Sequence, residues 1–345
     1  MSFILGNGFN YLIENIIRSI PVEQIPGNLH TDQAKLANKI REISGLWARF
    51  DNLFRDLKGN YPHLSDEELI RMIYTVLDFL SGMQGFEKVL TADQINQIKN
   101  TFNFLLIDQI KEITEEFRTH QEDEGYKDLK RLFPDFGQSF NSLLEQSEVE
   151  RCDFFTTNYD GILDTLMTYP DRRGFLSVDG FGAIPDDPNY LKLYDENLDG
   201  IIRIFHIHGS YRFERIYGTT YKSRSNFYNN DPVIIFNNPE LKEELIHRDT
   251  VLRTYLHTLE HSLKDSDKLV IMGNSMRNEP HIKQHIKRYF NNQDKHLYVC
   301  SRNPTPVKRE LGIFFNHTIH ERSTNGINSI ANLIEFIDEI IKHAP

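Results

Sequence analysis

Cysteine is scarce in this sequence. Its 345 residues include two cysteines, Cys152 and Cys300, each inside an apolar stretch. Isolated cysteines in such stretches usually behave as small buried hydrophobic residues. Two of them cannot supply the paired Cys-x-x-Cys pattern of a structural zinc site. We therefore expect no zinc module built from cysteines.

Long hydrophobic runs are also missing. No apolar run approaches the roughly 18 residues that a membrane-spanning helix requires. The first residues, Met1-Ser2-Phe3-Ile4-Leu5, lack the basic and apolar regions of a secretory signal and instead indicate a strand. The sequence thus predicts a cytoplasmic protein with no membrane contact.

Positive charge is in deficit. Lys and Arg total 39 against 50 Asp and Glu, which gives a formal net charge of −11. Broad nucleic-acid binding depends on clustered Lys and Arg, so nucleic acid is not expected as a partner. A small anionic ligand stays compatible, because backbone N–H groups at a glycine turn and a helix N-terminus can hold phosphate.

A glycine turn stands near the start of the chain. The apolar segment Phe3-Ile4-Leu5 is followed by Gly6-Asn7-Gly8-Phe9 and then by a helix from about Asn10. Strand, glycine turn and helix in this order point backbone N–H groups at a phosphate. The third glycine of the dinucleotide fingerprint is absent, so an ordinary tight turn remains the alternative.

Strands that alternate with helices predict an α/β protein with a doubly wound, mainly parallel, Rossmann-like sheet. Residues 31–150 indicate helix almost throughout and suggest a large helical insertion or subdomain. The sheet domain would then comprise residues 1–30 and 151–345. Residues 169–200 suggest a functional loop or a hairpin, and residues 215–230 a mobile flap. One long helix is expected from about Pro239 to Leu263.

The segment from Phe154 to Asp164 combines a buried strand with an unusually polar turn. Thr156, Thr157, Asn158 and Asp160 follow the strand directly. A strand-to-helix turn needs one capping residue rather than four donors and acceptors. An open α/β sheet places its ligand crevice at such a strand end. For Asp160, helix capping is as good an explanation as a role in the crevice.

A His-x-His pair follows on the strand that begins at Ile201. His206 and His208 alternate with apolar residues, so both are expected on the same face. Histidine is the commonest metal ligand, but no third ligand follows at a useful spacing, and we expect no metal. His206 is expected to be structural. His208 lies beside Gly209 at the strand end, which favours a functional role.

Two further apolar strands end in polar residues. The first leads into Gly273-Asn274-Ser275 and then Arg277, and the second into Ser301-Arg302-Asn303-Pro304. With the glycine turn and the turns at Thr156 and His208, this makes five polar strand ends. Five such ends on one edge of a sheet would form a nucleotide crevice.

Taken in order, the five motifs resemble those of the sirtuin superfamily. Within it, they are most similar to the bacterial sirtuin-like domains of anti-phage defence, and also to abortive-infection families with a Gly-Asn-Gly-Phe start. The resemblance covers roughly residues 1–20 and 150–325. Asn7 and Phe9 depart from the usual phosphate loop. The zinc cysteines of protein-deacylating sirtuins are absent, which favours the zinc-free branch.

The resemblance implies an NAD+ glycohydrolase, for which NAD is the substrate and no metal is needed. It assigns catalysis to Asn158, His208 and Asp160. It assigns NAD contacts to Gly6, Asn7, Gly8, Phe9, Thr156, Thr157, Gly273, Ser275, Arg277 and Asn303. A homo-oligomer is expected, with a defence-system protein or a phage component as partner or trigger. The alternatives are a sensor of NAD or ADP-ribose without turnover, and a zinc-free deacylase.

Overall fold

A seven-stranded parallel sheet forms the centre of the protein. The computed structural model describes residues 1–29, 32–44, 59–64, 66–82, 90–98, 124–167, 177–185, 187–223, 232–235 and 241–343. The strand order is β12-β11-β10-β1-β2-β6-β3, and every neighbouring pair is parallel. The strands are β1 (Ser2–Leu5), β2 (Cys152–Thr156), β3 (Ser177–Val178), β6 (Ile202–His206), β10 (Lys268–Met272), β11 (His296–Ser301) and β12 (Ile319–Ser323). The predicted doubly wound α/β class is confirmed.

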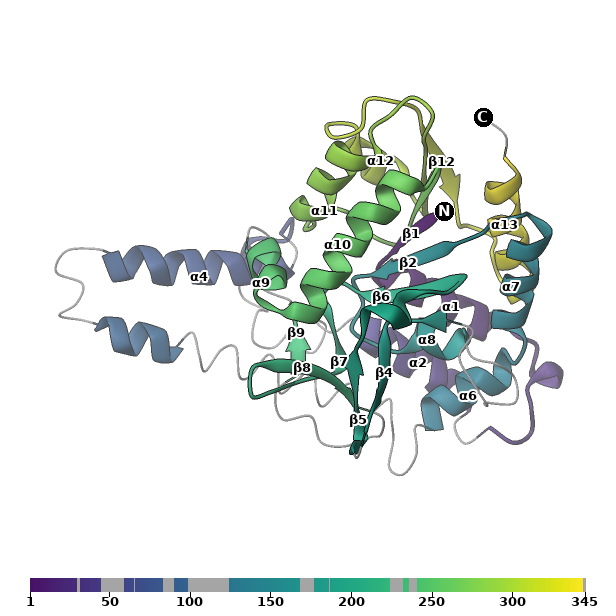
Figure 1. Cartoon of the computed structure of the whole chain (residues 1–345), viewed down its shortest axis with the longest axis horizontal. Helices are drawn as coiled ribbons and strands as arrows, with labels where there is room; N and C mark the ends of the chain where they lie inside the picture. The colour runs from purple at the N-terminus through teal and green to yellow at the C-terminus, as the bar shows by residue number, and fades with distance from the viewer. Residues whose placement is uncertain are drawn as a thin grey trace.

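Both faces of this sheet are buried. Alternate residues of a strand point to opposite faces, and in β1 Phe3 and Leu5 join one core while Ile4 joins the other. The central strands are therefore apolar almost throughout, as parallel sheets require. Figure 1 shows helices on both sides of the sheet. They include α1 (Asn7–Ser19), α8 (Ile162–Leu166), α11 (Pro280–His285), α12 (Thr305–Leu311) and α13 (Ile330–Lys342).

A second, antiparallel sheet lies beside the first. Its order is β4-β5-β8-β7-β9. The strands are β4 (Phe181–Ile184), β5 (Asp187–Leu193), β7 (Gly209–Ile216), β8 (Thr219–Ser223) and β9 (Pro232–Ile234). The β4–β5 pair confirms the hairpin considered for residues 169–200. In the predicted flap, residues up to 223 form the paired strands β7 and β8. The mobility of this segment stays a prediction, and residues 224–231 lie outside the described chain.

The long helix predicted up to Leu263 is two helices. The structure has α9 (Lys242–Arg248) and α10 (Thr250–Asp265), separated by Asp249 in an extended conformation. The Asp249 side chain accepts hydrogen bonds from the amides of Val251 and Leu252. A carboxylate in this position caps a new helix, so the chain turns where the apolar periodicity alone indicated continuity.

Part of the predicted helical insertion packs on the sheet domain. Helices α2 (Gln33–Ser44), α6 (Glu124–Leu132) and α7 (Phe136–Gln146) supply residues such as Ile40 and Phe140 to a core that also contains Phe3. Helix α4 (Asp66–Gly82) extends away from the main body in Figure 1. The proposed domain division stays a prediction. Within the described residues, no helix has the length and apolar character needed to cross a bilayer.

Two glycine turns touch each other at the carboxyl edge of the sheet. The amide of Gly8 donates to the carbonyl of Gly273 at 2.8 Å. A Cβ atom on Gly8 would lie 2.5 Å from Cα of Gly273, and one on Gly273 would lie 2.2 Å from the amide nitrogen of Phe9. Gly273 also has a φ of +68°, which side-chain-bearing residues rarely adopt. Neither turn therefore tolerates a side chain here.

We expect Gly273→Ala to destabilise the protein by about 1–3 kcal/mol, because it adds backbone strain to a backbone clash. The measurement is the free energy of unfolding in urea. Gly27→Ala is the matched control, since a Cβ at Gly27 meets nothing within 4 Å. Equal stability of the two variants would contradict the close contact described here.

Candidate functional site

The polar turns that follow the strands start at the same level of the parallel sheet. Leu5 is paired with both Thr156 and Met272, and Thr156 is paired in turn with His206. Each of these residues is the last of its strand, so the turns that follow lie side by side. The expectation that the polar turns meet on one edge is confirmed. Asn158 and His208 both lie two residues beyond a paired strand end.

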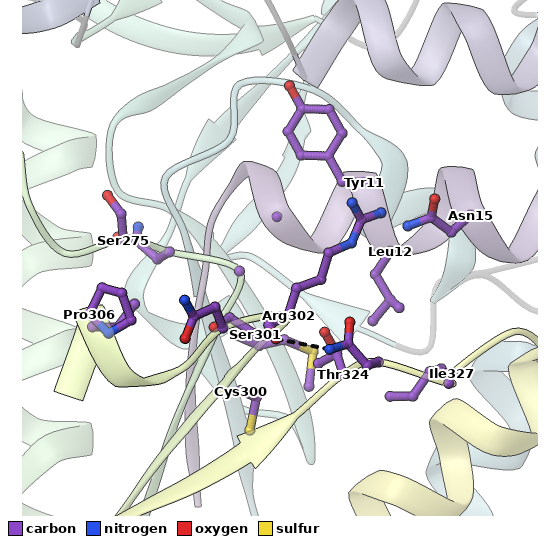
Figure 2. Close-up of a pocket in the computed structure, with 18 of the residues that line it drawn as sticks. Tyr11, Leu12, Asn15, Ser275, Cys300, Ser301, Arg302, Pro306, Thr324 and Ile327 are labelled. Carbon is purple, nitrogen blue, oxygen red and sulfur yellow. Dashed lines mark hydrogen bonds between the residues drawn. The ribbon is translucent and has the colours of Figure 1, made fainter. Parts of the chain in front are cut away.

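A cavity of about 510 Å³ opens at this edge (Figure 2). It lies over the ends of β1, β10, β11 and β12, and α1 forms one wall. Among the residues predicted to contact NAD, Gly8, Gly273, Ser275 and Asn303 line it. Ligand pockets typically measure about 300–1,000 Å³, so the volume suits a nucleotide.

Two neighbouring residues on β11 and in its turn add polar groups to the cavity. The Ser301 hydroxyl is buried and has no hydrogen-bond partner among the described residues. Such a group costs free energy unless a ligand or water satisfies it. Arg302 lines the same cavity, and its side chain reaches toward Tyr11 and Asn15 of α1 in Figure 2. An arginine there provides a cation for phosphate.

The amides of the first glycine turn already have partners. Gly6 donates to the carbonyl of Met272 at 3.2 Å, and Phe9 donates to that of Gly6 at 2.9 Å. The Gly8 amide is bonded to Gly273 as described above. Asn7 begins α1 and is exposed. The phosphate contacts expected of this turn stay a prediction. In the structure, its Gly6 and Gly8 amides bond to the end of β10 and the turn after it.

Thr156, Thr157 and Arg277 lie outside the cavity lining. The hydroxyl of Thr156 accepts the amide of Asn158 at 3.0 Å, and that of Thr157 accepts Nδ2 of Asn274 at 3.1 Å. Arg277 instead forms an ion pair with Glu68 of α4, with its Nη2 3.2 Å from Oε1. Of the two arginines near this edge, Arg302 is thus the one placed to meet a ligand in the cavity.

Asn158 is buried and held by three contacts. Its backbone amide is bonded to Thr156, its Nδ2 donates to Oδ1 of Asn10 at 3.2 Å, and its carbonyl lies 3.0 Å from Nδ1 of His206. Its Oδ1 atom is buried and unpartnered within the described structure. The side chain of Asn158 is thus held in place, and its Oδ1 is a hydrogen-bond acceptor without a partner among the described residues.

Asp160 and Asn10 set the orientation of that amide. Oδ1 of Asp160 accepts the amide of Ile162 at 3.0 Å, and its Oδ2 accepts Nδ2 of Asn10 at 2.7 Å. Asn10 therefore turns its oxygen toward Asn158, which leaves Oδ1 of Asn158 pointing elsewhere. Burial raises the pKa of Asp160, while these two hydrogen bonds act against that rise. Asp160 accepts the amide of the first residue of α8 and also positions Asn10.

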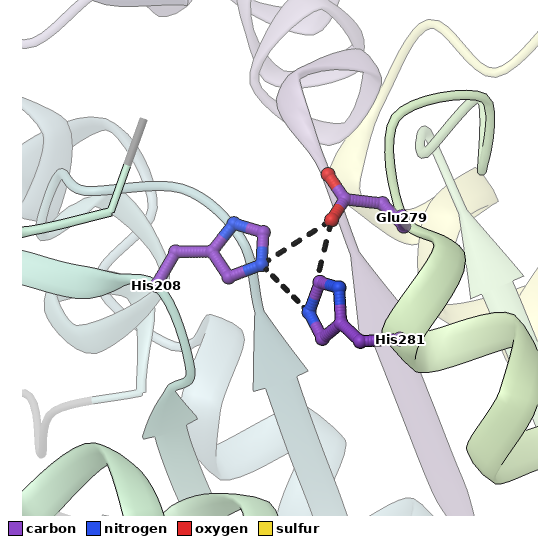
Figure 3. A group of neighbouring side chains, drawn as sticks. All are labelled: His208, Glu279 and His281. Atoms are coloured by element: carbon purple, nitrogen blue, oxygen red, sulfur yellow. Dashed lines mark hydrogen bonds and ion pairs between the residues drawn. The ribbon is translucent and has the colours of Figure 1, made fainter. Parts of the chain in front are cut away.

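His208 belongs to a buried cluster with Glu279 and His281 (Figure 3). It is 1% exposed and lies in the turn between β6 and β7. Its Nε2 is 3.2 Å from Nε2 of His281 and 3.3 Å from Oε2 of Glu279. The second oxygen of Glu279 accepts from Nζ of Lys242 at 3.1 Å, and Lys242 is 0% exposed.

The titratable groups of this cluster influence one another. Burial lowers the pKa of both His208 and His281, which keeps both imidazoles neutral near pH 7. Burial by itself would raise the pKa of Glu279, but the Lys242 ammonium and the two histidines outweigh it and hold that pKa well below its usual range. The cluster therefore contains an ion pair and two neutral rings.

His206 has a different set of partners. Its Nε2 lies 2.9 Å from Oδ2 of Asp164 on α8, and its Nδ1 faces the carbonyl of Asn158. Burial works to lower its pKa, but Asp164 outweighs burial and the net shift is upward. Both nitrogens are partnered, as expected of a structural histidine. The two histidines of the His-x-His pair thus have different partners. His206 contacts Asn158, and His208 contacts Glu279.

Sequence reasoning did not assign Asn10, Lys242, Glu279, His281, Ser301 or Arg302. Asn10 and Lys242 fall inside amphipathic helices, where polar residues are expected on the exposed side. Glu279 and His281 flank Pro280 in a helix start, where polar residues are common. Arg302 carried a usable signal, since it is a cation in one of the five polar turns. The other positions become informative only once their burial is known.

Comparison with known proteins supports a sirtuin-like family for the second half of the sheet domain. Residues 153–320 match the family model described as the SIR2-like domain. This range contains Asn158, His208, the Glu279 cluster and the cavity residues on β10 and β11. A sirtuin-like domain implies NAD involvement. A search of curated proteins gave no match.

The His206–Asp164 pair predicts a pH-dependent stability. Because the pKa of His206 is raised in the folded protein, the pair's stabilisation is full below about pH 6.5, the unfolded value, and is lost as pH rises through the folded pKa. We expect His206→Gln to lose more free energy of unfolding, relative to the parent, at about pH 6 than at about pH 9. Urea unfolding at both values measures this. The exposed His317→Gln serves as control, and the same pH trend in that variant would contradict the assignment.

Proposed function

We propose that this protein is an NAD+ glycohydrolase that cleaves the bond between nicotinamide and ribose, giving nicotinamide and ADP-ribose. The observation that carries the proposal is the buried, unpartnered Oδ1 of Asn158. Asn158 follows β2 and His208 follows the neighbouring strand β6. Both lie on the edge where the cavity opens, but neither belongs to the cavity lining. The SIR2-like match over residues 153–320 supports the involvement of NAD.

In this proposal the two parts of the edge bind different parts of the substrate. The cavity over β10 and β11 takes the adenosine and phosphates. Ser275, Ser301 and Asn303 provide hydrogen-bonding groups, and Arg302 provides positive charge. The turns after β2 and β6 take the nicotinamide ribose. Binding energy from the distant adenosine half can then serve to orient the reacting ribose.

Asn158 and His208 supply the chemistry. Cleavage of this bond builds positive charge on the ribose, and a water or ribose hydroxyl must be placed for attack. Oδ1 of Asn158 accepts a hydrogen bond from that hydroxyl or water. A neutral imidazole has one donor and one acceptor nitrogen. When Nε2–H of His208 donates to Glu279, Nδ1 is left as the proton acceptor, so Glu279 and Lys242 act as positioning residues.

The cellular role we propose is that of an anti-phage, abortive-infection effector in the cytoplasm, acting as a homo-oligomer and triggered by a phage component or a defence partner. It rests on the likeness of the five motifs to defence domains. A protein that depletes NAD must stay silent until needed. The burial of His208 and the pairing of Arg277 with α4 agree with a resting state.

A sensor of NAD or ADP-ribose without turnover is the second candidate. The 1% exposure of His208 favours it, because a base that substrate cannot reach does no chemistry. The two functions differ in one product. A hydrolase releases nicotinamide, whereas a sensor binds NAD and returns it intact.

We expect His208→Ala and Asn158→Ala to lower the rate of nicotinamide release by about 10²–10⁴-fold, because each removes a group that acts on the reacting ribose. Chromatographic quantification of nicotinamide and ADP-ribose measures this. His257→Ala, which changes a histidine on the exposed side of α10, should retain the parent rate.

The same variants test the cellular role. Expression of the parent should deplete NAD and slow growth, and His208→Ala should relieve both effects. Nicotinamide release at the parent rate by both variants would sink the assignment of Asn158 and His208. Tight NAD binding by a parent protein that never releases nicotinamide, even when expression is toxic, would favour the sensor.

The cavity predicts which arginine meets the phosphates. Arg302→Ala should weaken NAD binding at least about 10-fold, since charge-assisted hydrogen bonds contribute about 1.5–3 kcal/mol each. Arg277→Ala is the matched control, because Arg277 pairs with Glu68 and does not line the cavity. Isothermal titration with NAD on the His208→Ala background prevents turnover. A greater loss for Arg277→Ala would reverse the assignment.

A further inference from the structure

Three side-chain atoms of the His208 cluster converge on one point. These atoms are Nε2 of His208, Nε2 of His281 and Oε2 of Glu279, and they are separated by 3.2, 3.3 and 3.9 Å. All three residues are buried. Figure 3 shows the two rings and the carboxylate pointing toward one another from the β6–β7 turn and the start of α11.

Protons alone do not satisfy this arrangement. A single N–H between the two Nε2 atoms can bond to the other ring or to Glu279, and two N–H groups facing each other at 3.2 Å would repel. With no N–H there, three lone pairs face one another. Oε2 of Glu279 is buried, and its 3.3 Å contact with Nε2 of His208 is long for a hydrogen bond to a carboxylate. A cation accepts all three lone pairs at once.

We propose that His208, Glu279 and His281 form a binding site for a divalent transition-metal ion of the Zn²⁺ type. Ligand atoms that bind one ion at about 2.1 Å in a tetrahedron lie about 3.4 Å apart, close to the separations seen here. Two imidazoles and one carboxylate suit Zn²⁺ or Co²⁺, whereas Mg²⁺ and Ca²⁺ prefer oxygen ligands.

Lys242 shapes the site without entering it. Its ammonium contacts Oε1 of Glu279, which leaves Oε2 as the single ligand oxygen and makes the carboxylate monodentate. Its positive charge also weakens the attraction of Glu279 for a cation. The site therefore depends on the two imidazole nitrogens, which again disfavours the hard cations.

Metal binding has a consequence for His208 that rests on the proposed function. An imidazole bound through Nε2 keeps its proton on Nδ1, so Nδ1 can no longer accept a proton from water or ribose. The same three residues would then exist in two states. The metal-free state has His208 available as a base, and the metal-bound state has it withdrawn.

The primary test uses cobalt as a spectroscopic probe and needs no enzyme activity. The full chain, stripped of metal with a chelator, is titrated with Co²⁺ while visible ligand-field absorption is recorded. We expect bands that saturate at a single equivalent and that Zn²⁺ abolishes. His281→Gln should weaken Co²⁺ binding at least about tenfold, since it removes one of three ligands.

His285→Gln is the matched control, because His285 lies on the same helix but faces Glu260, with its Nδ1 3.5 Å from Oε1. His281→Gln is preferred over Glu279→Gln because it leaves the buried Lys242–Glu279 pair intact, and circular dichroism checks its fold. Absence of bands in the parent, or equal loss in the two histidine variants, would overturn the site.

A second arm separates this proposal from the hydrolase proposal. Metal-free protein should release nicotinamide, and saturating Zn²⁺ should suppress the release until a chelator is added. Undiminished nicotinamide release with Co²⁺ bound would contradict the proposal that metal binding removes His208 as a base. If the cobalt bands appear and neither metal-free nor metal-bound protein releases nicotinamide, even when expression is toxic, the metal site stands and the hydrolase proposal fails.

Discussion

The direct contact between two glycine turns fixes the edge on which every candidate functional residue lies. Gly8 and Gly273 approach so closely that neither leaves room for a Cβ atom. The contact keeps the ends of β1 and β10 aligned. The pairing of neighbouring parallel strands then aligns the ends of β2, β6 and β11 with them. Polar turns separated by many residues in the chain become neighbours because their strands end together.

Buried polar groups then give this edge its chemistry. Asp160 orients Asn10, and Asn10 orients Asn158. On the next strand end, Lys242 holds Glu279, and Glu279 faces His208. Burying such groups costs several kcal/mol for each ion unless partners are precisely placed. The two chains of contacts meet this cost and at the same time hold the side chains of Asn158 and His208 rigidly, as a preorganised site requires.

The elements that were predicted correctly have strong local signals. The strand at Cys152 and the turn at Asn158 follow from an apolar run that ends in polar residues. The predictions that failed depend on contacts that apolar periodicity does not report, whether local, as between Asp249 and Val251, or distant in the chain. Apolar periodicity did not show that Asp249 would cap a second helix, nor that Gly209 would begin a strand of a separate sheet. The placement of Arg277 and Arg302 was open for the same reason, since both follow strands of the same edge.

The sequence by itself determined the order of apolar strands and polar turns, and hence the sheet and its carboxyl edge. The alternation of apolar and polar residues and the conformational freedom of glycine are local properties of the chain, so the sequence alone reveals them. Only the tertiary structure decided what surrounds His208. His208 contacts His281, which is 73 residues away in the chain. Within the described residues, it shares no partner with His206, which is two residues away. Such pairings depend on which helices pack over the strand ends, and no local pattern specifies that.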